Sequence, residues 1–315
     1  MKIGIVGSGA MGSVYGALLA DAGNELWMLD RWQEHVEAMR SKGLRCAGAS
    51  GDRTVRVHAT TEAVEAGPCE LVIVATKVMD IEDAVRAAAP MIGPESLVLA
   101  IQNGLGNVER IQKVSSADNL LFGIAGGFGA EMVGPGHVHH NGMEAINLAE
   151  LAGGISARLE RVGDVWRQAG FTVNVYDDLW PVVWSKLVAN VAFSAICTVT
   201  GMRTGQVCAN EWAWGIARAC VEEAATVAAA KGIKLAYDDP VRWVWDFAHK
   251  IPNARPSMYQ DVRAGRRSEI DSIQGGVVAE GAKLGIPTPT CALMVQLVKA
   301  LEAKSRAHGD AYQAL

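Results

Sequence analysis

The feature that most constrains this chain is a glycine-rich segment near its start. Gly7-Ser8-Gly9-Ala10-Met11-Gly12 has the pattern G-x-G-x-x-G and directly follows the apolar run Ile3–Val6. The next stretch, Met11–Ala22, is rich in alanine and leucine, lacks proline and ends at Gly23, as a helix would. In such a strand–turn–helix unit, the glycines permit a tight turn, close approach of a phosphate group and close packing of helix on strand. The segment therefore predicts a dinucleotide site with the pyrophosphate at the helix N-terminus, the alternative being a plain glycine-rich turn in another α/β fold.

The end of the second predicted strand bears on which dinucleotide is bound. Glu25–Leu29 is followed by Asp30 and Arg31. Asp30 lies close to the spacing of ~20 residues at which an acid binds the ribose 2′-hydroxyl, which favours NAD. Arg31 is suited to a 2′-phosphate, which favours NADP. The spacing does not decide between the two cofactors, and Asp30 could instead only cap the following helix.

The other strands of the first half alternate with helical stretches, a pattern typical of a parallel sheet covered on both faces. They are Leu71–Ala75, Leu97–Ala100 and Leu120–Ile124. The carboxyl ends of parallel strands face the ligand, so Lys77 and Asn103, which follow two of these strands, are candidate ligand contacts. A loop lysine such as Lys77 is also commonly just solvated.

After Gly123, closely spaced glycines predict turns and antiparallel hairpins. Three histidines occur in this region, His137, His139 and His140. No carboxylate or cysteine stands at matching spacing, so we assign no metal to them.

From about Leu179 onward the sequence is helical in character. Long stretches with few helix breakers, separated by Gly/Pro/Asn clusters, are Trp184–Ser194, Ala209–Lys231, Asp239–Ile251 and Glu269–Leu284. The predicted fold class is therefore α/β, with an N-terminal Rossmann-type doubly wound sheet in residues 1–178. An all-helical C-terminal domain is expected in residues 179–315.

One of these helices contains a candidate proton donor. Lys186 and Asn190 are four residues apart, hence on one helix face, and their neighbours Trp184, Leu187 and Val188 are apolar. Desolvation lowers the pKa of a lysine toward neutrality, which suits a group that donates a proton to a ketone oxygen near pH 7. An ordinary lysine on a helix surface is the alternative reading.

Two further polar residues stand in the helical half. Glu269 could bind a ligand or could simply be an acid in the first turn of a helix, favoured by the helix dipole. Ser257 could contact a ligand or could be a cap or turn residue.

Composition limits the partners and the compartment. The 315 residues carry a net charge of −5, and no run of Lys/Arg stands out, so neither nucleic acid nor an anionic membrane is an expected partner. The six cysteines show no C-x-x-C spacing and are expected to be reduced and mostly buried, as in the cytoplasm. We see no signal peptide and no run of ~18 uncharged apolar residues. Pairing of the helical domain with a second copy, to give a homodimer, is the quaternary state that we expect.

Taken together, the motifs resemble one family, the ketopantoate reductases (2-dehydropantoate 2-reductases), over essentially the whole chain. The motifs that carry the resemblance are Gly7–Gly12, Gln102-Asn103-Gly104, Trp184-x-Lys186-x₃-Asn190, Ser257-Met258-x-Gln260-Asp261-x₇-Glu269-Ile270-Asp271 and Gly285-Ile286-Pro287-Thr288-Pro289. The family pairs a Rossmann domain with an all-helical domain and reduces a small 2-keto acid in the cleft between them.

The resemblance implies a role for each matching residue. Lys186 and Glu269 would be the catalytic residues: Lys186 would be the general acid, and Glu269 would bind a substrate hydroxyl and contact the cofactor. Asn103 and Asn190 would orient substrate and cofactor. Ser257 would contact the substrate carboxylate, and Arg31 would bind the 2′-phosphate of NADP. The cofactor would also be contacted by Lys77 and by the loop residues Gly7, Ser8, Gly9, Ala10, Met11 and Gly12. The resemblance thus favours NADP over NAD, against the charge of Asp30.

Departures from the family pattern bear on the substrate. Ser194, an expected substrate contact, stands where the family often has an asparagine, and Ala254 replaces a further asparagine near Ser257. Discrimination by hydrogen bonds depends on each partner being present, so the losses weaken the case for ketopantoate itself. Seven of the nine tryptophans lie at or beyond Trp166. Most are expected in packing, but one or two could line a broader pocket, so the alternatives are a reductase of a bulkier 2-keto acid and a non-catalytic dinucleotide-binding regulator.

Overall fold

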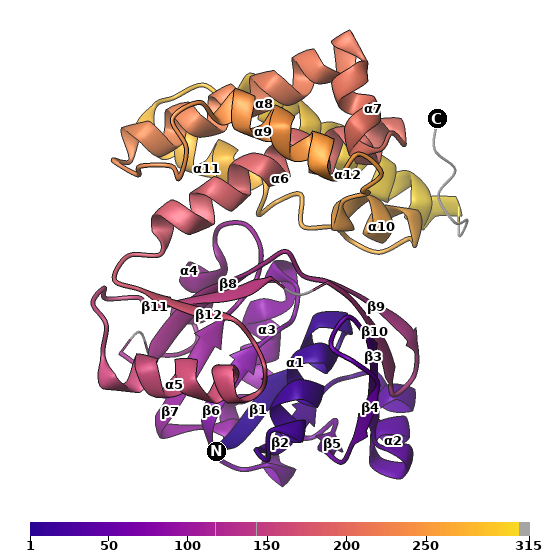
Figure 1. Cartoon of the computed structure of the whole chain (residues 1–315), viewed down its shortest axis with the longest axis vertical. Coiled ribbons are helices and arrows are strands. Elements are labelled where there is room, and N and C mark those ends of the chain that lie inside the picture. The colour runs from indigo at the N-terminus through magenta and orange to yellow at the C-terminus, as the bar shows by residue number, and fades with distance from the viewer. Residues whose placement is uncertain (117, 143, 309–315) are drawn as a thin grey trace. The chain divides into compact units, whose positions relative to one another are not determined.

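The computed structural model describes residues 1–116, 118–142 and 144–308 (Figure 1). Its internal contacts divide the chain into two compact units. Unit 1 comprises Met1–Gln102 and Asn107–Leu179, and unit 2 comprises Asn103–Gly106 and the described residues from Trp180 onward. The short loop Asn103–Gly106 therefore groups with the helical unit although it directly follows a strand of unit 1.

Unit 1 is built on an eight-stranded sheet with the strand order β12-β11-β8-β7-β6-β1-β2-β5. Pairing is parallel from β8 through to β5, β11 pairs antiparallel with β8, and β12 pairs parallel with β11. The strands are β1 (Lys2–Val6), β2 (Glu25–Leu29), β5 (His58–Thr60), β6 (Cys69–Val74), β7 (Ile92–Ala100), β8 (Leu120–Gly126), β11 (Ala145–Glu150) and β12 (Val173–Tyr176). The five strands predicted from the sequence are confirmed.

The strand order places the glycine-rich segment at a topological switch point. β1 lies between β2 and β6, so Ile3 is flanked by Leu26 on one side and Leu71 on the other. The chain thus leaves β1 toward β2 on one side and returns to β6 on the other. In open α/β sheets, a ligand binds at such a point, outside the carboxyl ends of the strands.

A second sheet of four strands, with the order β4-β3-β10-β9, completes unit 1. It contains β3 (Leu44–Gly48), β4 (Arg53–Val55), β9 (Gly129–Gly134) and β10 (His137–Gly142). β9 and β10 form the antiparallel hairpin expected after Gly123, and the three histidines lie on β10. The sequence analysis did not predict β3 and β4. β4 pairs with β3, and β3 pairs with β10, which is about ninety residues away along the chain.

Helices cover both faces of the large sheet. The helical segments of unit 1 are α1 (Ala10–Asp21), α2 (Gln33–Lys42), η1 (Ala63–Glu65), η2 (Val78–Asp80), α3 (Ile81–Ala87), η3 (Ala89–Met91), α4 (Asn107–Gln112) and α5 (Ala157–Gln168). One core includes α1 and α5, where the rings of Tyr15 and Trp166 meet edge-on at 5.0 Å. A smaller core on Val6 and Val72 is closed by residues of η1 and η3.

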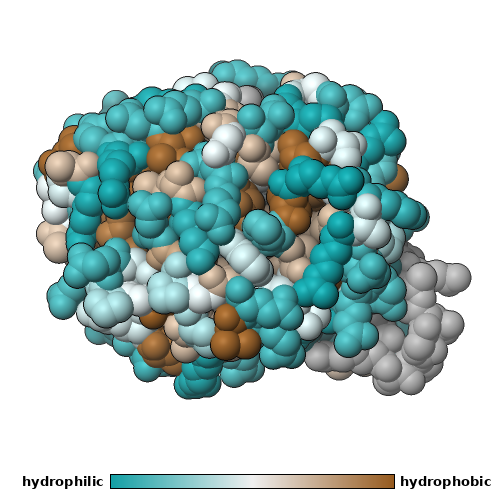
Figure 2. Space-filling model, turned by 90° about the horizontal axis from the view of Figure 1, so that it is seen from below, coloured by the Kyte–Doolittle hydropathy of each residue, from teal (hydrophilic) through white to brown (hydrophobic). Residues whose placement is uncertain are grey.

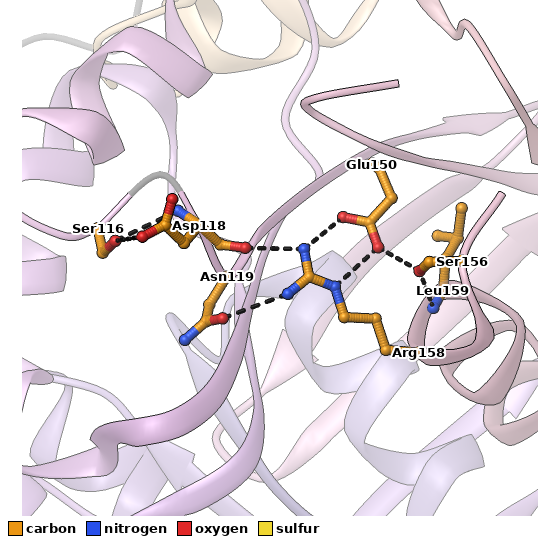
Figure 3. A network of polar contacts seen from close by, with 7 residues as sticks. All are labelled: Ser116, Asp118, Asn119, Glu150, Ser156, Arg158 and Leu159. Atoms are coloured by element: carbon orange, nitrogen blue, oxygen red, sulfur yellow. Dashed lines mark hydrogen bonds and ion pairs between the residues drawn. The ribbon is translucent and has the colours of Figure 1, made fainter. Parts of the chain in front are cut away.

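A polar network, shown in Figure 3, connects three elements of unit 1. Glu150, at the end of β11, is buried and accepts hydrogen bonds from Arg158 Nε and Nη2 at 2.8 and 2.7 Å. Arg158, near the start of α5, also donates to the backbone oxygen of Asp118 at 2.7 Å, just before β8. Ser156 caps α5 by accepting from Leu159 N and donates to Glu150. Arg158 therefore links the start of α5 to β11 through Glu150 and to the segment before β8 through Asp118.

Unit 2 is helical, as predicted (Figure 1). Its helices are α6 (Trp180–Thr200), α7 (Thr204–Ala209), α8 (Glu211–Ala230), α9 (Pro240–Lys250), α10 (Ser257–Arg263), α11 (Gln274–Leu284) and α12 (Pro289–His308). α6 packs against α8, α10 and α12 and forms the centre of the unit. By length and hydropathy α6 could cross a membrane, but 78% of its apolar window is buried inside the protein, as in a core helix.

The helix predicted for Glu269–Leu284 begins later than expected, at Gln274. Ser272 N and Ile273 N both donate to Glu269 O, and Ser272 O accepts from Leu105 N at 2.8 Å. The carbonyl oxygen of Ser272 is thus hydrogen-bonded to the Asn103–Gly106 loop, and the segment before α11 is a turn rather than a helix. The reading of Glu269 as an acid in the first helical turn is therefore wrong.

Side-chain burial agrees with the expectation for cysteine, whereas the tryptophans are mixed: two are buried, four are half-buried and three are exposed. All six cysteines are free and buried, and burial raises the pKa of Cys197 to about 12. Trp166 and Trp184 are fully buried, whereas Trp212 is exposed on α8. One face of the molecule, shown in Figure 2, is mainly hydrophilic with small hydrophobic areas scattered over it.

Candidate active site

The glycine-rich turn of unit 1 has three glycines with different surroundings. Gly7 adopts a left-handed φ of +89°, and a Cβ there would lie 2.5 Å from Thr76 Cγ2. A Cβ on Gly12 would collide with Gly7 O. Gly9 is exposed, and a Cβ there would meet no atom within 4 Å. The first and third glycines therefore serve the fold, and the second leaves open space beside the backbone.

This turn fits a pyrophosphate group. Gly9 is the N-cap of α1 and offers no side chain to the first N–H groups of the helix, and the first turn of α1 contains no acidic residue. Thr76 Oγ1 is buried beside the turn without a partner among the described residues. Helix N–H groups facing open space, with no competing carboxylate on the first turn, suit an anionic ligand.

Asp30 holds this turn in place. Its Oδ2 accepts from Ser8 N at 2.6 Å and from Ser8 Oγ at 3.1 Å, and its Oδ1 accepts from Trp32 N at 3.0 Å. The N-cap of α2 is Trp32, so the reading of Asp30 as a helix cap is wrong. Arg31, the next residue, is exposed.

Lys77 lies beyond the end of β6, the neighbour of β1 on the side opposite β2. It is half-buried and directly precedes η2. Ala75 N donates to Val6 O at 2.9 Å, which keeps the segment leading to Lys77 beside the end of β1.

In unit 2, Lys186 and Asn103 are in direct contact. Lys186 Nζ donates to Asn103 Oδ1 at 2.7 Å. Lys186 is half-buried on α6, and its neighbours Trp184, Ser185 and Leu187 are buried. The residues next to Lys186 along α6 are thus buried, and the amide oxygen of Asn103 fixes the position of the ammonium group.

The face of α6 that presents Lys186 continues with two more of the expected residues. Asn190 is half-buried one turn further along, and Ser194 is buried one turn beyond that. Residues spaced by four share a helix face, so the structure aligns these polar groups in a row.

Glu269 is buried in the turn before α11 and is linked to the Asn103 loop through Ser272. A Cβ on Gly104, which has a φ of +79°, would collide with Ser272 O. Leu105 N donates to the same oxygen. The loop holding Asn103 and the turn holding Glu269 are therefore packed backbone to backbone.

Ser257 differs from the other expected site residues. It is exposed and is the first residue of α10, whose N-cap is Pro256, so it is not the cap. Two residues before it, the Arg255 guanidinium lies over the Tyr259 ring at 4.3 Å, and its buried Nη1 has no partner among the described residues. A buried N–H without a partner is costly, and an anionic ligand would satisfy it.

Two residues on α12 support the turn that holds Glu269, and sequence reasoning missed both. Glu302 is buried, and one of its oxygens accepts from Ser268 N and Ser268 Oγ, each at 2.7 Å. Lys299 pairs with Asp271 at 2.6 Å. The sequence signal that could have revealed Glu302 is an acid within an otherwise apolar turn of helix.

Among the described residues, no group of three or more His, Cys, Asp or Glu could hold a metal ion. His137 and His139 on β10 are half-buried, and His140 is buried, with its Nδ1 3.0 Å from Ser50 Oγ.

Comparison with known proteins covers both units. The family model described as ketopantoate reductase PanE/ApbA matches residues 3–153, and its C-terminal counterpart matches residues 178–302. A curated 2-dehydropantoate 2-reductase of Streptococcus pyogenes is 31% identical over 96% of this chain and 98% of its own length. A ketopantoate reductase structure from Ralstonia eutropha has a TM-score of 0.90 at 31% identity, covering 97% of this chain and 100% of its own. A D-mandelate dehydrogenase solved with NADH and anilino(oxo)acetate has a TM-score of 0.89 at 28% identity, with the same coverage.

Proposed function

Because the chain belongs to the ketopantoate reductase PanE/ApbA family, we propose that it reduces 2-dehydropantoate, or a closely related 2-keto acid, to the 2-hydroxy acid with a reduced nicotinamide dinucleotide. The observation that carries the proposal is the contact of 2.7 Å between Lys186 Nζ and Asn103 Oδ1. A cationic N–H donor held in a fixed position is what a ketone oxygen needs as negative charge builds on it.

In this proposal Lys186 is the general acid. The reduced nicotinamide, when bound, supplies the hydride for the carbonyl carbon. Lys186 Nζ donates a proton to the carbonyl oxygen, which becomes the hydroxyl of the product, and the neutral amine then regains a proton from water. Asn103 accepts a hydrogen bond from the ammonium group and so limits the directions in which its other protons point.

The remaining polar residues of unit 2 bind the substrate. Glu269 accepts a hydrogen bond from a substrate hydroxyl and lies near the cofactor, and Asn190 and Ser194 line the same helix face as Lys186. Ser257 contacts the substrate carboxylate. Arg255, two residues earlier, has an Nη1 without a partner among the described residues, and its positive charge attracts the same carboxylate. Residues 179–315 are in this account the substrate domain, and residues 1–178 bind the dinucleotide.

For the cofactor, we propose a preference for NADPH over NADH. Arg31 is exposed beside the turn, and Lys77 follows the neighbouring strand. The carboxylate of Asp30 already accepts three hydrogen bonds from Ser8 and Trp32, which leaves it less able to bind a ribose hydroxyl. An Arg31→Ala variant would then raise the KM for NADPH far more than the KM for NADH. Equal effects on both would overturn this preference.

Turnover with 2-dehydropantoate tests the proposal directly. We expect the near-ultraviolet absorbance of the reduced cofactor to fall when enzyme and 2-dehydropantoate are mixed with NADPH. Binding of NADPH without turnover of any 2-keto acid in a panel would instead indicate a dinucleotide-binding regulator.

A second candidate substrate is a bulkier, aromatic 2-keto acid such as phenylglyoxylate. It is favoured by Ser194, where the family often has a larger amide side chain, and by similarity to a D-mandelate dehydrogenase. Comparison of kcat/KM for the two substrates separates the candidates, because a large preference for 2-dehydropantoate would exclude the aromatic one.

A further inference from the structure

A buried histidine lies behind the glycine-rich turn and is used by none of the roles above. His35, on α2, is fully buried, and its Nδ1 accepts a hydrogen bond from Gly136 N at 2.8 Å. Its Nε2 lies 3.3 Å from Ser13 Oγ, and Ser13 Oγ donates to Ser8 O at 2.7 Å. Ser13 is itself buried on α1. A chain of hydrogen bonds thus runs from the β9–β10 turn to the backbone of the turn beneath the pyrophosphate site.

The direction of this chain follows from its two ends. A backbone N–H can only donate, so Nδ1 of His35 carries no proton and the proton of the neutral ring is on Nε2. The Ser13 hydroxyl gives its proton to Ser8 O and therefore accepts from Nε2–H. Each of the three links has one donor and one acceptor, and the neutral ring is required to complete them.

His35 also contacts the second turn that the dinucleotide would touch. Its ring stacks against that of Trp32, with centroids 5.0 Å apart and planes 18° from parallel. Trp32 N donates to Asp30, whose other oxygen holds Ser8. His35 therefore supports both the turn after β1 and the turn after β2, through different atoms.

We propose that His35 is a positioning residue for the dinucleotide, acting through Ser13 on the turn that holds the pyrophosphate and through Trp32 on the turn that holds the adenosine ribose. The proposal rests on the cofactor binding proposed above. A backbone shift of a fraction of an ångström at Ser8 would misalign the N–H groups that face the ligand, and short hydrogen bonds are sensitive to such shifts.

The protonation state of His35 gives the proposal a pH signature. Burial lowers the pKa of His35, while the nearby charge of Asp30 and a hydrogen bond with the backbone of Ser8 act in the opposite direction. A proton added to Nδ1 of His35 would point at the N–H of Gly136, so the hydrogen bond between them would be lost. Because the folded pKa lies below the unfolded value, the neutral ring is fully retained above about pH 6.5 and is lost as the pH falls through the folded pKa.

Three variants test the proposal, with isothermal titration of NADPH and NADH as the readout. Ser13→Ala removes the middle link, His35→Ala removes the ring, and His35→Gln keeps an amide N–H in reach of Ser13. We expect Ser13→Ala and His35→Ala to raise the cofactor Kd by about 3–10-fold and 10-fold or more, and His35→Gln to restore much of the loss. Ser41→Ala, which removes an exposed serine-to-backbone bond on α2, is the matched control.

Kinetics and pH separate positioning from a purely structural role. We expect Ser13→Ala to raise the KM for the cofactor with kcat at saturation unchanged. We also expect the wild-type Kd for NADH to rise below pH 6.5, and that of His35→Gln to rise less. If the variants only melt earlier and bind cofactor as the wild type does, the positioning role is excluded and the proposed function stands. If the wild type binds neither cofactor, both proposals fail.

Discussion

At the scale of single residues, two glycines of the glycine-rich turn, Gly9 and Gly12, differ in the space available for a side chain. Gly12 has no room for a side chain, because a Cβ would collide with Gly7 O. Gly9 has ample room in the protein, and its φ of −61° is one that any residue adopts. The chain nevertheless has glycine at both positions, and packing within the protein accounts for Gly12 but not for Gly9.

This contrast predicts opposite outcomes for two variants of equal size. Gly9→Ala should lower the unfolding temperature only slightly, since alanine is a poorer N-cap than glycine, but should bind the dinucleotide more weakly, because the added methyl group occupies the space beside the backbone. Gly12→Ala should lower the unfolding temperature, because the turn must open to accept it. Thermal unfolding with and without NADPH measures both effects. A Gly9→Ala protein that binds NADPH normally would refute the assignment of this space to the pyrophosphate.

The sequence could predict these residues but not their bonds. The spacing of the motif identified the turn and Asp30, because it reflects local geometry that every such strand–turn–helix unit shares. It could not show that Asp30 would accept from Ser8, or that Lys186 would meet Asn103. Those contacts join residues that are distant along the chain, and only the folded backbone brings them together.

At the scale of elements, α12 holds the turn that contains Glu269. Glu302 and Lys299, one turn apart on α12, bind Ser268 and Asp271 on either side of Glu269. The turn is thereby fixed at two points, and the side chain of Glu269 is placed by its neighbours. The sequence analysis named no helix after Leu284 and began the preceding helix at Glu269 rather than at Gln274, whereas α12 begins at Pro289. Proline is well tolerated in the first turn of a helix.

We predict unequal effects for the two residues of α12. Glu302→Ala leaves the buried N–H of Ser268 without an acceptor and should lower the free energy of unfolding by about 1–3 kcal/mol. It should also raise the KM for the keto acid, because the turn holding Glu269 loosens. Lys299→Met removes a half-exposed ion pair and should change stability by no more than about 1 kcal/mol. Urea unfolding and steady-state kinetics measure these effects, and equal losses for both variants would argue against the distinction.

At the scale of the whole molecule, each unit has its own stabilising contacts. Unit 1 depends on pairings between distant segments, such as β10 with β3 and Glu150 with Arg158. Unit 2 is built around the single buried helix α6. The alternation of strands and helices predicted the fold class of unit 1, and long stretches with few helix breakers predicted that of unit 2. The hairpin of β9 and β10 was expected, but its pairing with β3 was not, because those segments are about ninety residues apart.

The Glu150–Arg158 pair predicts how unit 1 responds to acid. Burial raises the pKa of Glu150, but the hydrogen bonds from Arg158 and Ser156 outweigh it and leave the pKa below its usual range. Since the folded pKa is lowered, this contribution to stability is present above about pH 4.5 and is lost as the pH falls through the folded pKa. Arg158→Met should therefore lower stability at pH 7 by about 1–3 kcal/mol and flatten its pH dependence below pH 5.

Arg167→Met is the matched control for this prediction. Arg167 lies on the same helix, α5, and pairs with Glu160 and Asp164 at the surface. Surface pairs contribute little, so its loss should matter by less than about 1 kcal/mol. Chemical unfolding from pH 4 to pH 7 compares the two. The account of the network would be wrong if Arg167→Met proved the more damaging change.

The most direct test of the central claim, that Lys186 protonates the keto acid, is the turnover of Lys186→Met beside that of Lys250→Met. Lys250 is an exposed lysine at the end of α9, so its variant controls for the loss of a positive charge from unit 2. With NADPH binding measured separately, we predict that Lys186→Met loses about 10²–10⁴-fold in kcat with its cofactor Kd little changed, while Lys250→Met behaves as the wild type. A Lys186→Met enzyme that reduces the keto acid at the wild-type rate would contradict the account.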